Sequence, residues 1–254
     1  MLKEFARDFV IRSADCDRFG RLAPSQALII MQEMAGEHAH LLGLGREALF
    51  KENAVWVLTR SEVHFIRYPL YLESVRVRTF HGKVRRMLFP RFFIFETADG
   101  VRLAAASNYW ALMDIRTGNM VLPPIALSLT PDTADIVPPM GCPSPVSIVD
   151  GAEESSLFTP SYTDLDVNGH VNNTRCADWA CNLLGERLLK DRPIQTLTVN
   201  YNREIKGSEP LTFSFRKNEN SFSLRCLRGS LSYVDVGGTL AEAGTLPLSP
   251  LAAP

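Results

Sequence analysis

The sequence is poor in the residues that build metal centres and disulfide frameworks. Its 254 residues include five cysteines and five histidines, and no two cysteines have the C-x-x-C spacing of a zinc ribbon or a redox motif. His38 and His40 lie two residues apart in a segment with helical periodicity, so they point to different faces of the helix. We therefore expect no metal, no cofactor and reduced, scattered thiols.

The chain also lacks an excess of charge of either sign. Lys and Arg number 27 against 28 Asp and Glu, so no global positive field would hold nucleic acid or an anionic membrane. Unbroken apolar runs such as residues 27–31 fall far short of the roughly 20 residues that span a bilayer, and the N-terminus lacks the apolar core of a signal peptide. We expect a cytoplasmic protein without a membrane or nucleic-acid partner.

What is present is a globular composition divided by proline. Hydrophobic residues make up 46% of the chain and its mean hydropathy is −0.02, which is enough for a substantial core. Eight of the 16 prolines fall between Pro123 and Pro160, and such a segment predicts a long connection, because proline is excluded from helix interiors and central strands. We predict a first domain at 1–122, a Pro-rich linker at 123–157, a second domain at 158–247 and a tail at 248–254.

The two predicted domains share one order of elements. In the first, Pro24 begins a helix whose apolar residues recur with helical spacing up to Leu42. Four strand-like runs follow it, at 56–66, 74–80, 87–96 and 102–114. In the second, a helix extending from about Cys176 to Leu188 is followed by strands at 195–201, 211–215, 221–227 and 232–236.

The motif register supports a duplication. Residues 15–21 align with residues 164–170 at an offset of 149, and Arg67 aligns with Arg203 at an offset of 136. The difference requires a shorter helix–strand connection in the second copy. Two helix-then-four-strand units in one chain are therefore predicted.

The densest polar cluster precedes the second helix, at residues 164–173. It contains Asp166, Asn168 and His170. A histidine can change its charge near neutral pH, a carboxylate can orient it or act as a nucleophile, and an amide or free helix N–H groups can face an oxyanion. Asp and Asn are also favoured at helix starts, so the cluster by itself favours a capped helix start over a catalytic site.

Two runs of the sequence resemble the acyl-ACP thioesterases of plant plastids and bacteria. These are residues 165–173 and residues 195–204, which end in Arg-Glu, and residues 56–60, 67–69 and 110–118 add weaker matches. The resemblance implies an α+β fold of two tandem hot-dog units, each a long central helix wrapped by an antiparallel β-sheet. It also implies hydrolysis of the thioester of fatty acyl-acyl carrier protein, which releases a free fatty acid and ends fatty acid synthesis.

Carried over to this sequence, the family's catalytic set falls on Asp166, Asn168, His170 and Glu204. The resemblance implies that Asn168 polarises the thioester carbonyl and that His170 positions groups or protonates the leaving thiolate. It leaves the attack to Asp166 or to a water activated by Glu204. Many plant members have a cysteine after the glutamate, but here that residue is Ile205, which argues against a thiol nucleophile.

The first copy has Phe19 and Arg21 where the second has Asn168 and His170, so one catalytic centre is expected. The resemblance assigns the acyl chain to the first half. Three helix residues are candidates for the pocket wall, although for any one of them an ordinary core position is the favoured interpretation: Met31, Met34 and Leu41. Two alternatives remain open, an acyl-CoA thioesterase using the same site and a non-catalytic acyl-binding protein.

A local positive charge lies between Ser74 and Phe95, an interval without any acid. Acyl carrier protein is acidic and presents its acyl chain on phosphopantetheine, so a basic strand surface could steer it. A solvated strand face is the other interpretation. The candidate docking residues are Lys83, Arg85, Arg86 and Arg91. The sequence does not decide between a monomer and a homodimer.

Overall fold

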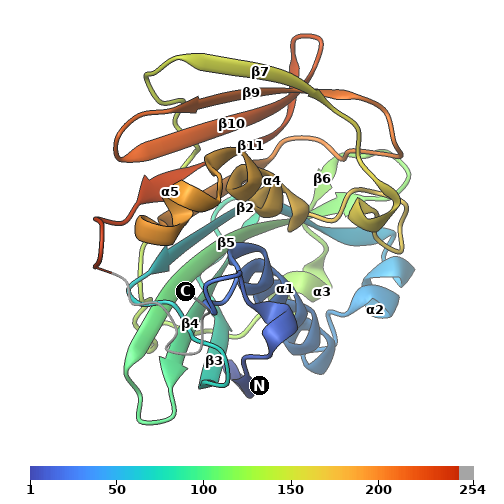
Figure 1. The fold of residues 1–254 in the computed structure, drawn as a ribbon. Helices are drawn as coiled ribbons and strands as arrows, with labels where there is room; N and C mark the ends of the chain where they lie inside the picture. Colours follow the sequence, from blue (N-terminus) through green and yellow to red (C-terminus); the bar gives the residue numbers. More distant parts are fainter. Residues whose placement is uncertain (246–254) are drawn as a thin grey trace.

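The computed structural model describes residues 1–245 and is built on one antiparallel sheet (Figure 1). The strand order is β1-β3-β4-β5-β2-β8-β11-β10-β9-β7, with β6 paired to β5. The strands are β1 (Glu4–Val10), β2 (Ala54–Phe65), β3 (Ser74–His81), β4 (Leu88–Thr97), β5 (Arg102–Asp114), β6 (Met120–Val121), β7 (Glu153–Phe158), β8 (Ile194–Tyr201), β9 (Leu211–Lys217), β10 (Ser221–Arg228) and β11 (Leu231–Leu240). The helices are α1 (Pro24–Leu41), α2 (Arg46–Lys51), α3 (Pro124–Leu129), α4 (Arg175–Leu184) and α5 (Glu186–Asp191), with single 3-10 turns at Ser13–Asp15 and Tyr162–Asp164.

The two halves of the sheet join where β2 pairs with β8. This pairing extends from Arg60 opposite Asn200 to His64 opposite Thr196. At its start, Arg60 Nε donates a hydrogen bond of 2.7 Å to Asn200 Oδ1. The two predicted units are therefore halves of one continuous sheet. Strand β2 of the first unit lies beside β8, the strand that leads to Glu204 in the second unit.

Pro24 is the first residue of the long helix α1. Proline is tolerated at this position, because the first helical N–H groups have no intrahelical acceptor. Its buried residues include Met31 and Met34, which pack in a cluster that also contains Phe93 of β4 and Trp179 of α4. Helices α1 and α4 contact each other (Figure 1). The predicted α+β class and the tandem hot-dog arrangement are confirmed.

The Pro-rich segment is more structured than a plain connection. It contains α3, whose prolines occupy the helix start, and it ends in β7, which pairs with β9. β7 lies between Pro145 and Pro160 in the sequence and at an edge of the sheet, where the requirements on the backbone are weakest. The strand β1, at the opposite edge, is a second strand that the charged sequence Glu4–Val10 does not reveal.

The predicted second helix is interrupted. Gly185 has a positive φ of 81° and separates α4 from α5. Glycine adopts this conformation at no steric cost, so it ends α4 and lets the chain turn before α5 begins. Residues 246–254, which include the predicted tail at 248–254, lie outside the described residues.

Candidate active site

The loop before α4 is held by one carboxylate. Asp166 Oδ1 accepts hydrogen bonds from the backbone N–H of Asn168 at 2.8 Å and of His170 at 3.2 Å. The Asp166 N–H in turn donates to the His170 carbonyl at 2.7 Å. Gly169 completes this tight turn with a positive φ of 73°, which glycine permits. The Asp and Gly positions therefore determine where the His170 side chain leaves the backbone.

The same loop is bonded to the chain beyond β8. The Val171 N–H donates to the Ile205 carbonyl at 2.8 Å, and the backbones of His170 and Lys206 form an isolated antiparallel β-bridge. This brings His170 Nε2 to 3.7 Å from Glu204 Oε2, although 34 residues separate the two in sequence. The structure thus brings together the loop residues and the strand-end glutamate that the resemblance implied.

The four residues differ in their contacts. Asn168 Nδ2 lies 3.4 Å from Asp166 Oδ2 and the Asn168 side chain is exposed. The side chain of Glu204 is 53% exposed and that of His170 is 28% exposed, so both can meet water and a substrate. Asp166 Oδ1 is bonded to backbone N–H groups of its own loop. A charged imidazolium and the carboxylate of Glu204 would attract each other at this distance.

Sequence reasoning missed Lys206. Its Nζ lies 3.5 Å from Glu204 Oε2, the same oxygen that faces His170. Residues two apart in an extended segment point to the same side, so the spacing from Glu204 to Lys206 could have indicated this contact. Lys206 therefore places a second cationic group beside the Glu204 carboxylate.

The thiols are not arranged as nucleophiles. Cys176 is buried, its Sγ donates to the Asn173 carbonyl at 2.9 Å, and burial raises its pKa to about 12. Burial raises the pKa of Cys181 to about 12 as well, and raises that of Cys226 well above its ordinary value. A catalytic cysteine needs a lowered pKa. The buried Ile205 occupies the position after Glu204.

Two of the three predicted acyl-contacting residues are core residues. Met31 and Met34 are buried in the main hydrophobic cluster. Leu41, the last residue of α1, is 56% exposed, whereas its neighbours Ala39 and Leu42 are buried in a second hydrophobic cluster. Its assignment to a pocket wall stays a prediction.

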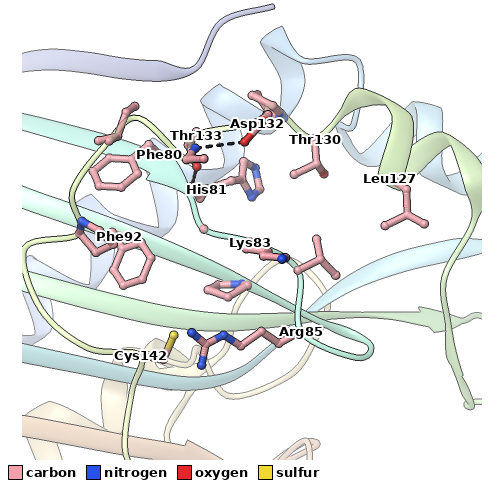
Figure 2. Close-up of a pocket in the computed structure, with 17 residues that line it drawn as sticks. Phe80, His81, Lys83, Arg85, Phe92, Leu127, Thr130, Asp132, Thr133 and Cys142 are labelled. Atoms are coloured by element: carbon pink, nitrogen blue, oxygen red, sulfur yellow. Dashed lines mark hydrogen bonds between the residues drawn. The ribbon is translucent and has the colours of Figure 1, made fainter.

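The basic residues between Ser74 and Phe95 differ in their exposure to solvent. Lys83, Arg85 and Arg86 are exposed on the hairpin between β3 and β4, and the first two also line a pocket (Figure 2). Arg91 is buried, and its Nη1 contacts His38 Nδ1 at 3.0 Å and Thr79 Oγ1 at 3.2 Å. Its prediction as a docking residue is wrong, because Arg91 points from β4 toward α1.

The corresponding loop of the first copy has the same backbone scaffold. Asp17 Oδ1 accepts hydrogen bonds from the N–H of Phe19 at 2.8 Å and of Arg21 at 3.0 Å. Gly20 has a φ of 72°, and the Leu22 N–H donates to the Pro69 carbonyl at 2.8 Å, as Val171 does to Ile205. The two loops that the sequence predicts to be duplicated therefore share these backbone hydrogen bonds.

In the first copy, different side chains occupy the positions equivalent to His170 and Glu204. Arg21 occupies the position of His170, and Tyr68 occupies that of Glu204, with the guanidinium 5.6 Å from the Tyr68 ring centre. Both side chains are buried. Arg21 Nη2 donates to the Leu189 carbonyl at 2.8 Å and Tyr68 Oη donates to the Ile194 carbonyl at 2.6 Å. In this copy the pair connects the two halves.

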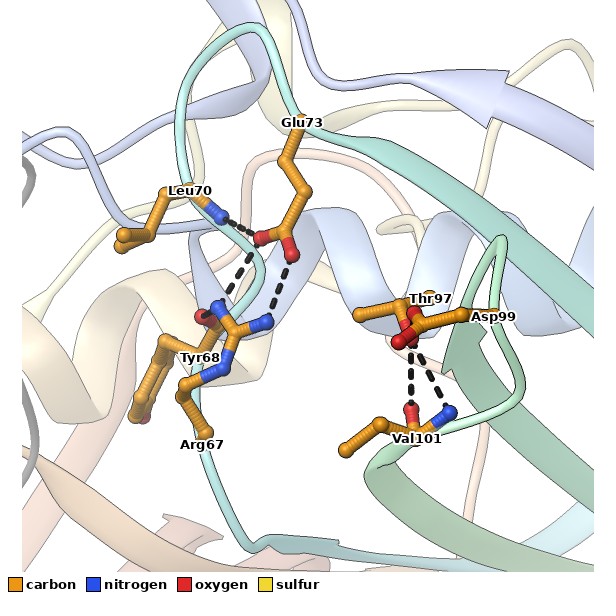
Figure 3. Close-up of polar contacts among 7 residues, drawn as sticks. All are labelled: Arg67, Tyr68, Leu70, Glu73, Thr97, Asp99 and Val101. Carbon is orange, nitrogen blue, oxygen red and sulfur yellow. Dashed lines mark hydrogen bonds and ion pairs between the residues drawn. The ribbon is translucent and has the colours of Figure 1, made fainter.

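The loop after β2 is closed by an ion pair (Figure 3). Arg67 Nη1 and Nη2 donate to the two carboxylate oxygens of Glu73, at 3.0 and 2.6 Å, and Glu73 also accepts from the Leu70 N–H at 2.9 Å. The equivalent Glu209 contacts Arg228 at 2.6 Å instead, and Arg203, the counterpart of Arg67, is exposed. The loop carrying Glu204 is thus closed by a different arginine.

No group of three or more His, Cys, Asp or Glu side chains in residues 1–245 could hold a metal ion. Within the same residues, no helix is both long enough and apolar enough to cross a membrane.

Two family models match this chain. The acyl-ACP thioesterase N-terminal domain matches residues 2–122, and the acyl-ACP thioesterase C-terminal domain matches residues 149–236. The first match lies before the Pro-rich segment, and the second begins near its end. Together they include both copies of the loop.

Curated relatives are identical to the chain at about a quarter of the aligned positions. A palmitoyl-acyl carrier protein thioesterase of Gossypium hirsutum is 28% identical over 237 residues, covering 87% of this chain and 57% of the relative. One of Cuphea hookeriana is 27% identical over 220 residues, covering 79% and 51%. The chain spans about half the length of the curated relatives it matches.

Solved structures share the fold over nearly the whole chain. An acyl-ACP thioesterase from Bacteroides thetaiotaomicron aligns with a TM-score of 0.82 at 24% identity, covering 93% of this chain and 97% of that one. A 12:0-ACP thioesterase from Umbellularia californica aligns with a TM-score of 0.78 at 22% identity, covering 93% and 96%. The tandem arrangement described above is therefore the fold of these proteins.

Proposed function

Because this chain belongs to the acyl-ACP thioesterase family, we propose that it hydrolyses the thioester of a fatty acyl-acyl carrier protein to a free fatty acid and the carrier thiol. The observation that carries the proposal is the approach of His170 to Glu204 on an exposed loop whose backbone is held by Asp166. A carboxylate and an imidazole within reach of each other and of water are the groups that thioester hydrolysis needs.

In the proposed reaction Glu204 takes a proton from water as the water oxygen attacks the thioester carbonyl carbon. The Asn168 amide donates to the carbonyl oxygen as its negative charge develops. The carbon–sulfur bond then breaks, and His170, as the imidazolium, protonates the leaving thiolate and regains its proton from Glu204. Asp166 orients the loop, a role supported by its two backbone hydrogen bonds and by the same bonds at Asp17.

We assign the acyl chain to the first half, residues 1–122, and the chemistry to the second. Each buried methylene contributes about 0.8 kcal/mol, so two carbons more or less change binding by roughly 1.6 kcal/mol, about fifteenfold. Chain length can thus be selected by the size of an apolar cavity. The exposed hairpin residues Lys83, Arg85 and Arg86 are proposed to attract the acidic carrier protein.

The decisive experiment measures hydrolysis of saturated acyl chains of graded length, each attached either to acyl carrier protein or to coenzyme A. We expect turnover of the carrier-linked series, with a preferred chain length, and slower turnover of the matched coenzyme A series. Faster hydrolysis of the coenzyme A series would identify an acyl-CoA thioesterase. Binding of both series without hydrolysis would contradict an enzymatic function.

A further inference from the structure

A pocket of about 620 Å³ lies on the first half, between the end of β3, the β3–β4 hairpin and residues 127–142 (Figure 2). It shares no residue with the loop of Asp166 and His170 or with Glu204. Its lining includes two basic side chains, Lys83 and Arg85, against one acid, Asp132. Its apolar walls include Phe80, Phe92, Leu127 and Ile136.

His81 lines this pocket and carries a hydrogen-bond donor without an acceptor. It is 3% exposed, and within residues 1–245 its Nδ1 has no hydrogen-bond partner. Its other nitrogen, Nε2, faces Arg91 Nη2. A guanidinium only donates, so Nε2 must accept and the ring proton must lie on Nδ1. A buried donor left without an acceptor costs about 1–3 kcal/mol.

Behind His81 lies a buried cation without a counter-charge. Arg91 is 2% exposed, and in residues 1–245 no carboxylate lies within ion-pair distance of it. Its partners are His38, Thr79 and His81, all of which act as neutral acceptors. Burial lowers the pKa of Arg91 to about 9. A buried charge of this kind is stabilised when a negative group approaches.

An anion in the pocket would satisfy both groups. If it accepts the Nδ1–H of His81, the imidazole becomes a stronger acceptor toward Arg91 and the negative charge lies one ring away from the guanidinium. Lys83 and Arg85 supply further positive charge at the pocket. The aromatic and aliphatic walls favour a ligand whose charged group carries an apolar chain.

We propose that this pocket binds a fatty acid, with its carboxylate directed at His81, Lys83 and Arg85 and its chain along Phe80, Phe92 and Ile136. The site is separate from the catalytic loop and does not depend on thioester hydrolysis. A fatty acid is also the product of the proposed reaction, so occupation of the pocket would report product concentration.

Cys142 provides a local probe, because it lines the pocket and is partly exposed. We would alkylate the native protein with and without dodecanoate below its micelle concentration, and measure each cysteine by peptide mass spectrometry. At ten times its dissociation constant, dodecanoate should slow alkylation of Cys142 about tenfold. Cys16, which is also partly exposed and lies outside the pocket, should be unaffected.

Two comparisons make the result specific. Dodecanol, with the same chain and no charge, should protect Cys142 far less, and the double variant Lys83→Ala/Arg85→Ala should lose the protection by dodecanoate. Arg86→Ala, an adjacent exposed arginine that does not line the pocket, is the matched control and should keep it. Equal protection by dodecanol, unchanged protection in the double variant, or none in the native protein would each overturn the proposal.

A calorimetric titration of dodecanoate gives a second, label-free measurement. The double variant should bind one fewer molecule than the native protein. Identical stoichiometry and affinity would contradict the site. Because neither readout involves hydrolysis, a protein without thioesterase activity could still pass both tests, and an active thioesterase could fail them.

Discussion

The two copies of the loop before the central helix have nearly the same backbone hydrogen bonds and opposite surroundings. In the second copy His170 and Glu204 are partly exposed and 3.7 Å apart, whereas in the first Arg21 and Tyr68 are buried and bond to backbone carbonyls of the other half. The comparison teaches that the Asp-Gly turn is a structural scaffold. In the proposed mechanism the chemistry depends on side chains carried on that turn and on Glu204 beside it, whereas Arg21 and Tyr68 at the equivalent positions of the first copy pack between the halves.

The largest expected effect is on the second copy. His170→Ala, Asp166→Ala and Glu204→Ala should each reduce the hydrolysis rate by about 10²–10⁴-fold, because each removes a group that moves a proton or orients one that does. The melting temperatures should remain close to that of the native protein, since the side chains are partly exposed. The measurement is turnover of one acyl-acyl carrier protein. Near-native rates for any of the three would remove that residue from the site.

Replacing the two loop aspartates, Asp17 and Asp166, should lower the free energy of unfolding by different amounts. Asp17→Ala leaves the buried Arg21 guanidinium without its carboxylate partner, 2.9 Å away, and should cost about 3–5 kcal/mol of unfolding free energy. Asp166→Ala removes backbone hydrogen bonds from an exposed loop and should cost about 1 kcal/mol. Urea denaturation measures both. Equal losses would mean that burial does not distinguish the copies.

The pH dependence of stability should arise from the first half, which buries His38 and His81. Burial lowers the pKa of His38 to about 4 and that of His81 well below its ordinary value. Because the unfolded chain takes up these protons first, stability is full above about pH 6.5 and falls as the pH approaches 4, by about 3 kcal/mol for His38.

His38→Gln is the matched variant, since an amide can also accept from Arg91 and donate to the Leu2 carbonyl. Unfolding free energies measured from pH 7 to pH 4 should fall less steeply for this variant than for the native protein. An unchanged slope would exclude His38 as a source of the acid sensitivity.

A smaller effect is expected from the first half's exposed hairpin. Arg85→Glu with Arg86→Glu should raise KM for acyl-acyl carrier protein about three- to tenfold at low salt and less at high salt, because exposed charges are screened. Turnover of a short uncharged thioester should hardly change. Arg102→Glu, an exposed arginine on β5, controls for the change in net charge. Equal losses on both substrates would indicate structural damage.

The smallest expected effect tests the thiol mechanism. Cys176→Ala, Cys181→Ala and Cys226→Ala should keep most of the activity, since their pKa values are raised and each lies in or against the hydrophobic core. Small alkylating reagents should leave the native enzyme active. An inactive but folded cysteine variant beside an active Glu204→Ala would overturn the carboxylate mechanism.

Much of the fold could be predicted because its signals are local. The start of α1 at Pro24 and the central strands follow hydrophobic periodicity and turn residues. Edge strands β1 and β7 were missed, because edge positions tolerate charge and carry a weak apolar pattern. The break at Gly185 was missed because a single glycine in a periodic segment does not reveal its φ.

The sequence by itself determined the duplicated register and the loop scaffold, since an aspartate and a glycine at set spacing form the same turn in both copies through bonds to their neighbours. Only the tertiary structure decided which side chains are available to a partner. Arg91 is buried although its sequence neighbours Arg85 and Arg86 are exposed, and His170 meets Glu204 across 34 residues. Burial and long-range contact depend on which elements pack together, and no local pattern encodes that.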